Sequence, residues 1–268
     1  MKWLIQDSLT WAALENNIRP LVVALRELNI PFASIGVVPF TIPSRKNAVK
    51  LQLNRTVTGL DDHDPEEKTI FYGSTKLVEI TSGWRDFRPG VFYDDRWFDP
   101  QNWIGKRPDL LNENIKVISV GQLKRDWVSN VSFIKPVTVK AFTGQVIEVE
   151  EHKDWLDEYR DVPANVMVCV SDCVNIEREW RFFIVNGEII TGSLYNKFGC
   201  RITKEPITPE VWNKAREMAK VWMPSQNIVM DICKLNNGEF KVVEWNCLNA
   251  SGFYNSDCKA FVIAMEKM

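Results

Sequence analysis

An aspartate, a glutamate and an asparagine near the end of this 268-residue chain carry side chains that suit a metal ion. Asp231 lies inside an apolar run, and Glu244 and Asn246 flank a tryptophan in the next apolar run. Residues two apart on a strand share a face, and a turn at 236–238 is predicted to bring Asp231 close to the other two. Carboxylate and amide oxygens suit Mg²⁺, which takes a few protein oxygens together with phosphates and water. These residues favour a magnesium site over the alternative, which is a set of edge positions that face solvent.

Three cationic residues provide a second signal. Lys135 precedes a proline at the end of an apolar run, Lys140 follows five positions later, and Arg181 opens another apolar run. A triphosphate with Mg²⁺ needs cations against its oxygens, and arginine is favoured where a fork of donors matters. Each cation alone is typical of a solvated surface, so the signal comes from their combination with the acidic pair.

Glycine-rich phosphate-binding motifs are missing from the sequence. It contains neither G-x-x-x-x-G-K-[ST] nor G-x-G-x-x-G, which are the P-loop and dinucleotide-binding fingerprints. Thr143-Gly144 is either a turn that covers phosphates or an ordinary hairpin turn. A nucleotide would therefore depend mainly on the cations and the acidic pair.

The charge balance and composition argue against several partners. Lys and Arg total 33 against 35 Asp and Glu, a net charge of -2, which disfavours nucleic acid bound through phosphate neutralisation. No apolar run approaches the roughly 20 residues of a membrane span, so no membrane partner is expected. The two histidines, His63 and His152, exclude a His-rich metal site and disfavour a Ser-His-Asp triad. Six cysteines without a Cys-x-x-Cys pair indicate reduced core residues, so a cytoplasmic location is expected.

The elements that must position these residues fall into two halves, of which the first is predicted to be α/β. A strand at 3–5 and a buried strand at 32–38 flank a helix with apolar residues at helical spacing from Leu14 to Leu28. Pro20 either begins this helix or kinks it. The segments predicted next are a strand at 70–74, a helix at 75–81 and a packed irregular connection at 87–106.

The second half is predicted to be α+β with mostly antiparallel strands. Asn186-Gly187 is typical of a two-residue type I′ hairpin turn between strands at 181–185 and 188–191. The other expected elements are strands at 131–136, 145–149, 166–170, 228–234 and 239–245 and helices at 123–128 and 209–221. The change of pattern predicts a boundary between about 110 and 130.

The order of these segments resembles the ATP-grasp superfamily, and more narrowly its phage and bacterial clade named R2K for an arginine and two lysines. The similar segments, between about 130 and 255, are Phe-Ile-Lys-Pro (133–136), Thr-Gly (143–144), Glu-Trp-Arg-Phe-Phe-Ile-Val (179–185), Val-Met-Asp-Ile (229–232) and Val-Val-Glu-Trp-Asn (242–246). The resemblance implies an α/β pre-ATP-grasp domain at 1–120. It also implies an ATP-grasp domain at 121–268, made of two small α+β lobes with mostly antiparallel sheets and ATP between them.

The resemblance implies an ATP-dependent ligase that joins a carboxylate to an amine or a thiol. ATP would transfer its γ-phosphate to a small-molecule or peptide carboxylate, and an amine acceptor would attack the acyl phosphate, leaving ADP. Asp231, Glu244 and Asn246 would hold one or two Mg²⁺ ions that bridge the phosphates. Lys135 would contact the α- and β-phosphates.

The remaining catalytic roles implied by the resemblance belong to two cations. Lys140 would be the second lysine, near the β- and γ-phosphates or the incoming carboxylate. Arg181 would stabilise the transferring phosphoryl group and the acyl phosphate. Phosphoryl transfer needs positioning and charge neutralisation more than a protein nucleophile, which suits a site without histidine.

The adenine of ATP would lie against the backbone around Ser171, Asp172 and Cys173. Asp172 would hold the ribose hydroxyls, with Glu177 or Glu179 as alternatives. An acceptor pocket would be lined by Tyr195, Lys197, Arg201 and residues 249–254, although loop or core roles fit each of them at least as well.

Two alternatives use the same residues differently. A phosphotransferase of this fold would use ATP without an amine acceptor and would make a stable phosphoester instead of an amide. A nucleotide-binding module without turnover has no reason to keep costly charges at strand positions, so the acidic hairpin argues against it. A nucleic-acid ligase is disfavoured because Lys135-Pro136 is not a Lys-x-Asp-Gly motif.

Overall fold

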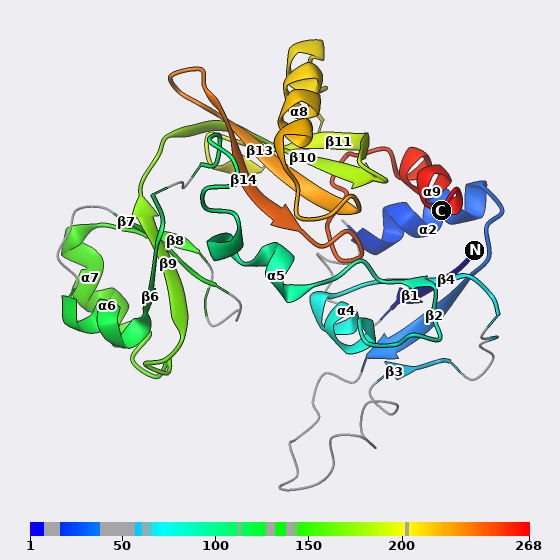
Figure 1. Cartoon of the computed structure of the whole chain (residues 1–268), viewed down its shortest axis with the longest axis horizontal. Coiled ribbons are helices and arrows are strands. Elements are labelled where there is room, and N and C mark those ends of the chain that lie inside the picture. Colours follow the sequence, from blue (N-terminus) through cyan, green and yellow to red (C-terminus); the bar gives the residue numbers. More distant parts are fainter. Residues whose placement is uncertain are drawn as a thin grey trace, which may run out of the picture.

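The structure, a computed structural model, describes residues 1–7, 17–37, 57–60, 64, 66–111, 114–126, 132–137, 142, 144–201 and 204–268. These parts of the chain form three β-sheets that follow one another along the long axis of the molecule (Figure 1). A mostly parallel sheet holds the N-terminal strands, a five-stranded antiparallel sheet lies in the middle, and a small four-stranded antiparallel sheet lies at the far end. The expected combination of an α/β domain with mostly antiparallel α+β lobes is therefore confirmed.

The N-terminal sheet carries the α/β part of the fold. Its elements span Lys2–Gln6 (β1), Arg19–Glu27 (α2), Phe32–Val37 (β2), Val57–Thr58 (β3), Thr69–Tyr72 (β4), Thr75–Thr81 (α4) and Pro89–Gly90 (β5). The strand order is β3-β2-β1-β4-β5, and only β3 is antiparallel to its neighbour. Parallel strands need crossover connections, and α2 and α4 lie in two of them.

Both of these helices begin where the sequence supplies a suitable first turn. α2 begins at Arg19, directly after a π-helical turn at 17–18, and Pro20 lies in its first turn, where its missing N–H breaks no hydrogen bond of α2. Ser74 caps α4, because its hydroxyl accepts a hydrogen bond from the backbone N–H of Leu77 at 3.2 Å. The helix predicted at 75–81 is confirmed, whereas the expected start of the first helix at Leu14 lies outside the described residues.

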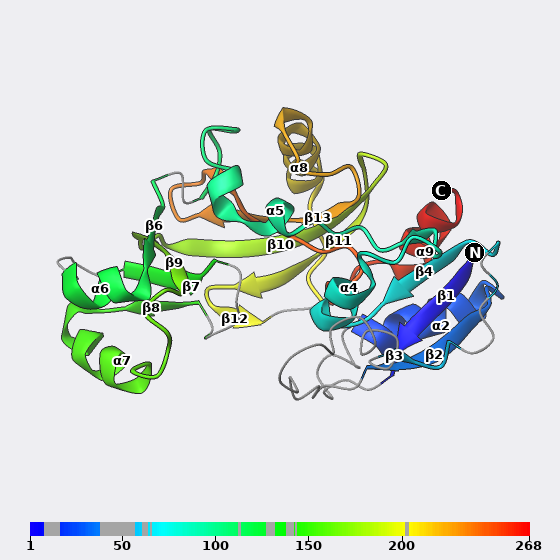
Figure 2. The same ribbon diagram turned by 60° about the horizontal axis from the view of Figure 1, so that its bottom comes forward.

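The last helix, α9 (Cys258–Glu266), completes the core of the N-terminal sheet. It packs beside α2, far in sequence from the strands that it covers (Figures 1 and 2). Phe261 and Met265 of α9 are buried in one apolar cluster with Trp3 and Tyr72 of the sheet. The N-terminal unit is therefore built from both ends of the described chain.

The central sheet has the antiparallel strand order β12-β11-β10-β13-β14. Its elements span Ile176–Val185 (β10), Glu188–Lys197 (β11), Cys200–Arg201 (β12), Pro209–Val221 (α8), Ile228–Leu235 (β13) and Phe240–Asn246 (β14). The turn between β10 and β11 has Asn186 and Gly187 at φ 51° and 81°, the left-handed values of the predicted type I′ hairpin. One face of this sheet packs under α8, whose predicted bounds at 209–221 are confirmed.

The small sheet has the antiparallel order β6-β9-β7-β8. Its elements span Lys116–Ser119 (β6), Val120–Asp126 (α6), Ser132–Pro136 (β7), Gln145–Ile147 (β8), His152–Glu158 (α7) and Met167–Asp172 (β9). Ile134 and Val168 are buried with Leu123 of α6 and Trp155 of α7, so both helices cover one face. The predicted helix at 123–128 is wrong in its start, because α6 begins directly after β6.

The strand predicted over 145–149 is wrong at its end. β8 ends at Ile147, and a 3₁₀ turn over Val149–Glu151 follows and leads into α7. The connection predicted at 87–106 is irregular apart from β5, the short helix α5 (Asp95–Phe98) and a 3₁₀ turn over Pro100–Asn102.

The packing bears on where one domain ends and the next begins. β6 pairs with β9, so the small sheet begins before residue 120, while α9 packs on the N-terminal sheet. The division into 1–120 and 121–268 therefore stays a proposal. Among the described residues, none of the helices combines the length and the apolar character that crossing a bilayer requires.

Candidate functional site

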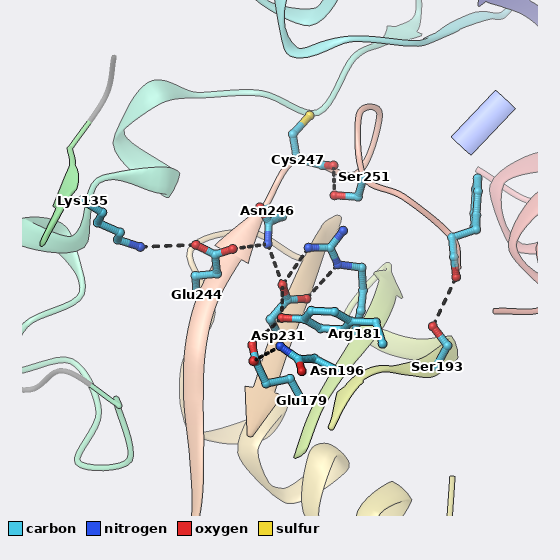
Figure 3. Close-up of polar contacts among 12 residues, drawn as sticks. Lys135, Glu179, Arg181, Ser193, Asn196, Asp231, Glu244, Asn246, Cys247 and Ser251 are labelled. Atoms are coloured by element: carbon cyan, nitrogen blue, oxygen red, sulfur yellow. Dashed lines mark hydrogen bonds and ion pairs between the residues drawn. The ribbon is translucent and has the colours of Figure 1, made fainter. Parts of the chain in front are cut away.

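A row of polar side chains crosses one face of the central sheet. Arg181 on β10 lies directly opposite Asp231 on β13, and Asp231 lies directly opposite Glu244 on β14. The amide of Asn246 donates hydrogen bonds to Asp231 at 3.0 Å and to Glu244 at 3.2 Å. These four residues, called the polar row below, are drawn in Figure 3. The fold thus brings together the three predicted metal ligands and the predicted arginine.

A β-bulge in β14 decides which way these side chains point. Val243 is an extra residue of β14 relative to β13. Val242 and Trp245 are both buried under α8, although they are three positions apart and a regular strand would put them on opposite faces. The bulge lets β14 bury both residues and still turn Glu244 and Asn246 to the face that carries the polar row.

Arg181 and Asp231 form a buried, bidentate ion pair. The guanidinium donates from Nε to Oδ1 at 2.9 Å and from Nη2 to Oδ2 at 2.7 Å. It also lies 5.4 Å and 5.3 Å from the ring centroids of Tyr195 and Tyr254, which stack on each other. Burial raises the pKa of Asp231, and the guanidinium opposes that rise. Burial would lower the pKa of Arg181, but the facing carboxylate raises it above its usual value.

Glu244 carries the partly exposed carboxylate of the polar row. Its side chain is 34% exposed, and its Oε2 lies 3.3 Å from Nζ of Lys135. Lys135 belongs to β7, so this ion pair links the small sheet to the central sheet (Figure 3). Burial alone would raise the pKa of Glu244, but Lys135, the Asn246 amide and Arg181 hold it below its usual value. The carboxylate is therefore ionised at neutral pH and able to hold a cation.

Glu179 extends this network, although the sequence suggested it only as an alternative ribose contact. Its carboxylate accepts hydrogen bonds from the Tyr195 hydroxyl at 2.7 Å and from Asn196 Nδ2 at 2.8 Å. The same hydroxyl lies 3.5 Å from Oδ2 of Asp231. Burial raises the pKa of Glu179, and the bond from Tyr195 opposes this. The signal for its position is the spacing of two residues from Arg181, which places both side chains on one face.

A cavity of about 590 Å³ opens beside the polar row. Lys135 of the small sheet lines it together with Glu244 and Asn246 of β14. Aromatic residues from the irregular connection, including Tyr93 and Trp103, form another part of its wall. No function could be predicted for this connection, because its sequence has no period from which a buried or exposed face can be assigned.

Ser171 lies on the face of the small sheet that carries Lys135. β7 and β9 pair Lys135 with Cys169, and Ser171 alternates to the same face two residues further on. Ser171 is 9% exposed, and its Oγ has no hydrogen-bond partner among the described residues. A buried hydroxyl without a partner carries a desolvation penalty, so this position fits a polar group of a ligand. Asp172 is exposed and alternates to the opposite face.

Four other predicted site residues are not among the described residues that line the cavity. Lys140 lies outside the described residues, and Cys173 is exposed just beyond β9. Arg201 stacks on Tyr254, with its guanidinium carbon 4.9 Å from the ring centroid. Asn249 is 1% exposed and bonds to the backbone of the N-terminal unit, so its position is structural.

The polar row offers a donor set that fits Mg²⁺. Among the described residues, no group of three or more His, Cys, Asp or Glu side chains is placed to hold a metal, so phosphate and water would complete the shell. Glu244 lines the cavity, and Asn246 donates both amide hydrogens to carboxylates, which leaves its Oδ1 as an acceptor. Asp231 is fully buried and accepts from Arg181, so it lies behind these two.

Comparison with known proteins points to one family. The sequence matches the family model described as ATP-grasp domain, R2K clade family 2, over residues 111–264. No curated protein matches the chain.

Solved structures share the fold over nearly the whole chain. D-cycloserine synthetase DcsG has a TM-score of 0.60 at 11% identity, covering 99% of this chain and 98% of that chain. D-alanine–D-alanine ligase from Bacillus anthracis has a TM-score of 0.59 at 10% identity, covering 99% and 96%. The ATP-grasp ligase PsnB, complexed with a phosphomimetic variant of its minimal precursor, Mg and ADP, has a TM-score of 0.58 at 12% identity, covering 99% and 97%. At these identities the likeness establishes the fold alone.

Proposed function

The chain belongs to family 2 of the R2K clade of ATP-grasp domains, and from this premise we propose that it is an ATP-dependent ligase that joins a carboxylate to an amine. The reaction transfers the γ-phosphate of ATP to the carboxylate, and the amine then attacks the acyl phosphate and releases phosphate, leaving ADP. The observation that carries the proposal is that Glu244 and Asn246 of the polar row line one cavity together with Lys135, which contacts Glu244. A lysine of the small sheet and two hard oxygen donors of the central sheet thereby border a single space, with Arg181 and Asp231 buried beside it.

The nucleotide lies between the small sheet and the central sheet in this proposal. Lys135 contacts the α- and β-phosphates, and Lys140 is the second lysine, near the β- and γ-phosphates or the carboxylate. The adenine lies at the end of β9 around Ser171, Asp172 and Cys173, where the buried hydroxyl of Ser171 has no partner among the described residues. The PsnB relative, which was solved with Mg and ADP, supports the same pair of ligands here.

A magnesium ion is held by Glu244 and Asn246, which border the cavity, with Asp231 behind them. When bound, it neutralises charge on the phosphate oxygens. Asp231 orients Arg181 and Asn246 by accepting hydrogen bonds from both side chains. It can bind the metal only if one of these hydrogen bonds breaks and frees a carboxylate oxygen. The ion pair of Arg181 and Asp231 therefore fixes the floor of the site.

Arg181 stabilises the charge that develops on the transferring phosphoryl group. Asp231 accepts two of the five N–H donors of its guanidinium, so three remain without a hydrogen-bond partner among the described residues and can bind the phosphoryl oxygens. Because the guanidinium is held by Asp231 and by the Tyr195 and Tyr254 rings, it needs little rearrangement during the reaction.

Calorimetric titration with Mg-ADP tests the nucleotide site without knowledge of the substrates. Wild type should bind ADP in a Mg²⁺-dependent manner, and Glu244→Gln should lose the Mg²⁺ dependence. Glu239→Gln is the matched control, because Glu239 is an exposed glutamate beside the turn of the same hairpin. The proposal fails if correctly folded wild type does not bind Mg-ADP, or if the control loses binding as well.

Product analysis separates the ligase from a phosphotransferase on the same fold. Panels of carboxylates and amines are screened for ADP release, and the products are identified by mass spectrometry. A new amide together with ADP and phosphate supports the ligase. A stable phosphoester without need of an amine supports the phosphotransferase instead.

A further inference from the structure

The cavity beside the polar row has two ends of different composition. The end at the small sheet is lined by Lys135 and Gly144, next to Glu244 and Asn246 of β14. The other end is lined from α4 and α5, and α4 lies on the far side of α5 from the small sheet (Figure 1). The cavity therefore extends beyond the space that the phosphates and their metal need.

The far end is acidic. Glu79 of α4 and Asp95 of α5 line it, and Lys135 is the one basic residue among the described residues of the whole lining. Lys135 is already paired with Glu244, at the opposite end. Glu79 has a surface partner in Lys76 at 3.5 Å, whereas no lysine or arginine pairs with Asp95 within the described part of the chain. An acidic end repels the phosphates of ATP and attracts a cation.

Aromatic rings form the second feature of this end. Tyr93 and Phe98 lie with ring centroids 5.5 Å apart at 35°, and both line the cavity. The Tyr93 hydroxyl donates a hydrogen bond to the Asp95 carboxylate, which fixes the ring beside the charge. Burial, the bond to Asp95 and the nearby charge of Glu79 raise the pKa of Tyr93, so its hydroxyl stays protonated. Aromatic faces combined with carboxylates suit an ammonium group.

We propose that this end of the cavity binds a positively charged group of the amine substrate, between Asp95 and Glu79 and against the ring of Tyr93. The inference rests on the proposed ligase function and adds a substrate class to it. This class is amines that carry a cationic group at the end of the cavity opposite the phosphates. An anionic or uncharged acceptor gains nothing from this end.

The place of these residues in the chain fits a role in specificity. Glu79, Tyr93, Asp95 and Phe98 all precede residue 111, where the match to the shared family domain begins. The metal- and phosphate-binding residues all lie inside the matched range. The residues that select the substrate thus come from a part of the chain that the family domain does not include.

Binding of small probes tests this inference on the full chain. Benzylammonium, benzyl alcohol and benzoate have similar shapes but different charges, and their binding is measured by saturation-transfer NMR with and without Mg-ADP. Benzylammonium should bind at least tenfold more tightly than benzyl alcohol, and benzoate should bind most weakly. Asp95→Asn and Glu79→Gln should each weaken benzylammonium binding several-fold. Asp157→Asn, an exposed aspartate on α7, is the control and should change nothing.

The outcomes separate this inference from the proposed function. Equal binding of the three probes, no binding of any of them, or unchanged binding in both variants overturns the cation site. Mg-ADP affinity and the melting temperature of each variant show that the fold and the nucleotide site are intact. If wild type selects benzylammonium but does not bind Mg-ADP, the cation site stands and the ligase proposal fails.

Discussion

Lys135 of β7 and Glu244 of β14 form an ion pair in the wall of the cavity, with Nζ and Oε2 3.3 Å apart. In the proposed function, each of them binds a different part of Mg-ATP. Binding therefore exchanges one ion pair for two contacts, in which Lys135 moves to phosphate and Glu244 to the metal. Without the metal, the carboxylate of Glu244 repels the phosphates and keeps Lys135 in an ion pair, so that Lys135 is less available to the phosphates.

This exchange predicts opposite effects of the two substitutions on metal-free ADP binding. In EDTA, Glu244→Gln should bind ADP several-fold more tightly than wild type, because the repulsion is gone and Lys135 is free. Lys135→Gln should weaken nucleotide binding by roughly tenfold or more, with or without metal. Calorimetry measures both, with Lys153→Gln on α7 as the control for a lost surface charge. Weaker metal-free binding by Glu244→Gln would contradict the exchange.

Substitution of Asp231 should affect stability as well as turnover. Asp231 is fully buried against Arg181. Removing its charge leaves a buried guanidinium without a counter-charge, which should lower the free energy of unfolding by about 3 kcal/mol. Urea unfolding measures this. The double variant Asp231→Leu/Arg181→Met removes both charges and should recover part of the loss, and an unchanged midpoint in Asp231→Asn would rule out the penalty.

Arg181 should matter more for rate than for nucleotide affinity. The negative charge that Arg181 stabilises develops on the phosphoryl group only during its transfer. Arg181→Lys should therefore lower kcat by roughly 100-fold, while the affinity for Mg-ADP changes little. Lysine keeps the charge but not the fork that Asp231 holds. Single-turnover ADP formation and calorimetry give the two values, and equal losses in both would remove this role from Arg181.

Glu179 should make stability fall as pH rises. Burial raises its pKa above the usual 4.5, so the folded protein binds this proton more tightly than the unfolded chain does. The stabilisation is present at low pH and is lost as the pH rises from about 4.5 through the folded pKa. Glu179→Gln should therefore lose less stability than wild type between about pH 5 and about pH 8. Urea unfolding across this range checks it, with exposed Glu158→Gln as the control. Parallel curves for wild type and Glu179→Gln would contradict this account.

Local signals predicted several elements of the fold well. The helix at 75–81 follows the capping residue Ser74, the helix at 209–221 begins with Pro209, and Asn186-Gly187 forms the predicted turn. Each of these signals acts within a few residues, so the local sequence is enough to predict where the helix or turn begins. The closeness of Asp231 to Glu244 and Asn246 was also predictable, because one short turn joins their strands.

Long-range pairing was beyond the reach of such signals. Arg181 meets Asp231 because β10 pairs with β13, and β11, β12 and α8 separate these two strands in the chain. The extra residue Val243 shows only in the register of the pair, since its side chain is an ordinary one for a strand. The cavity wall at Tyr93 and Asp95 belongs to an irregular segment. Its course depends on tertiary packing, because its sequence has no periodic pattern of apolar residues.

The position of α9 bears on how the protein folds as it leaves the ribosome. Trp3 and Tyr72 are translated early, but part of their covering comes from Phe261 and Met265 of α9. At typical rates of synthesis, these side chains wait on the order of 10 s or more for their partners. The N-terminal sheet is thus completed only after α9 has been translated, and the part of its apolar surface that Phe261 and Met265 cover stays accessible to chaperones and proteases until then.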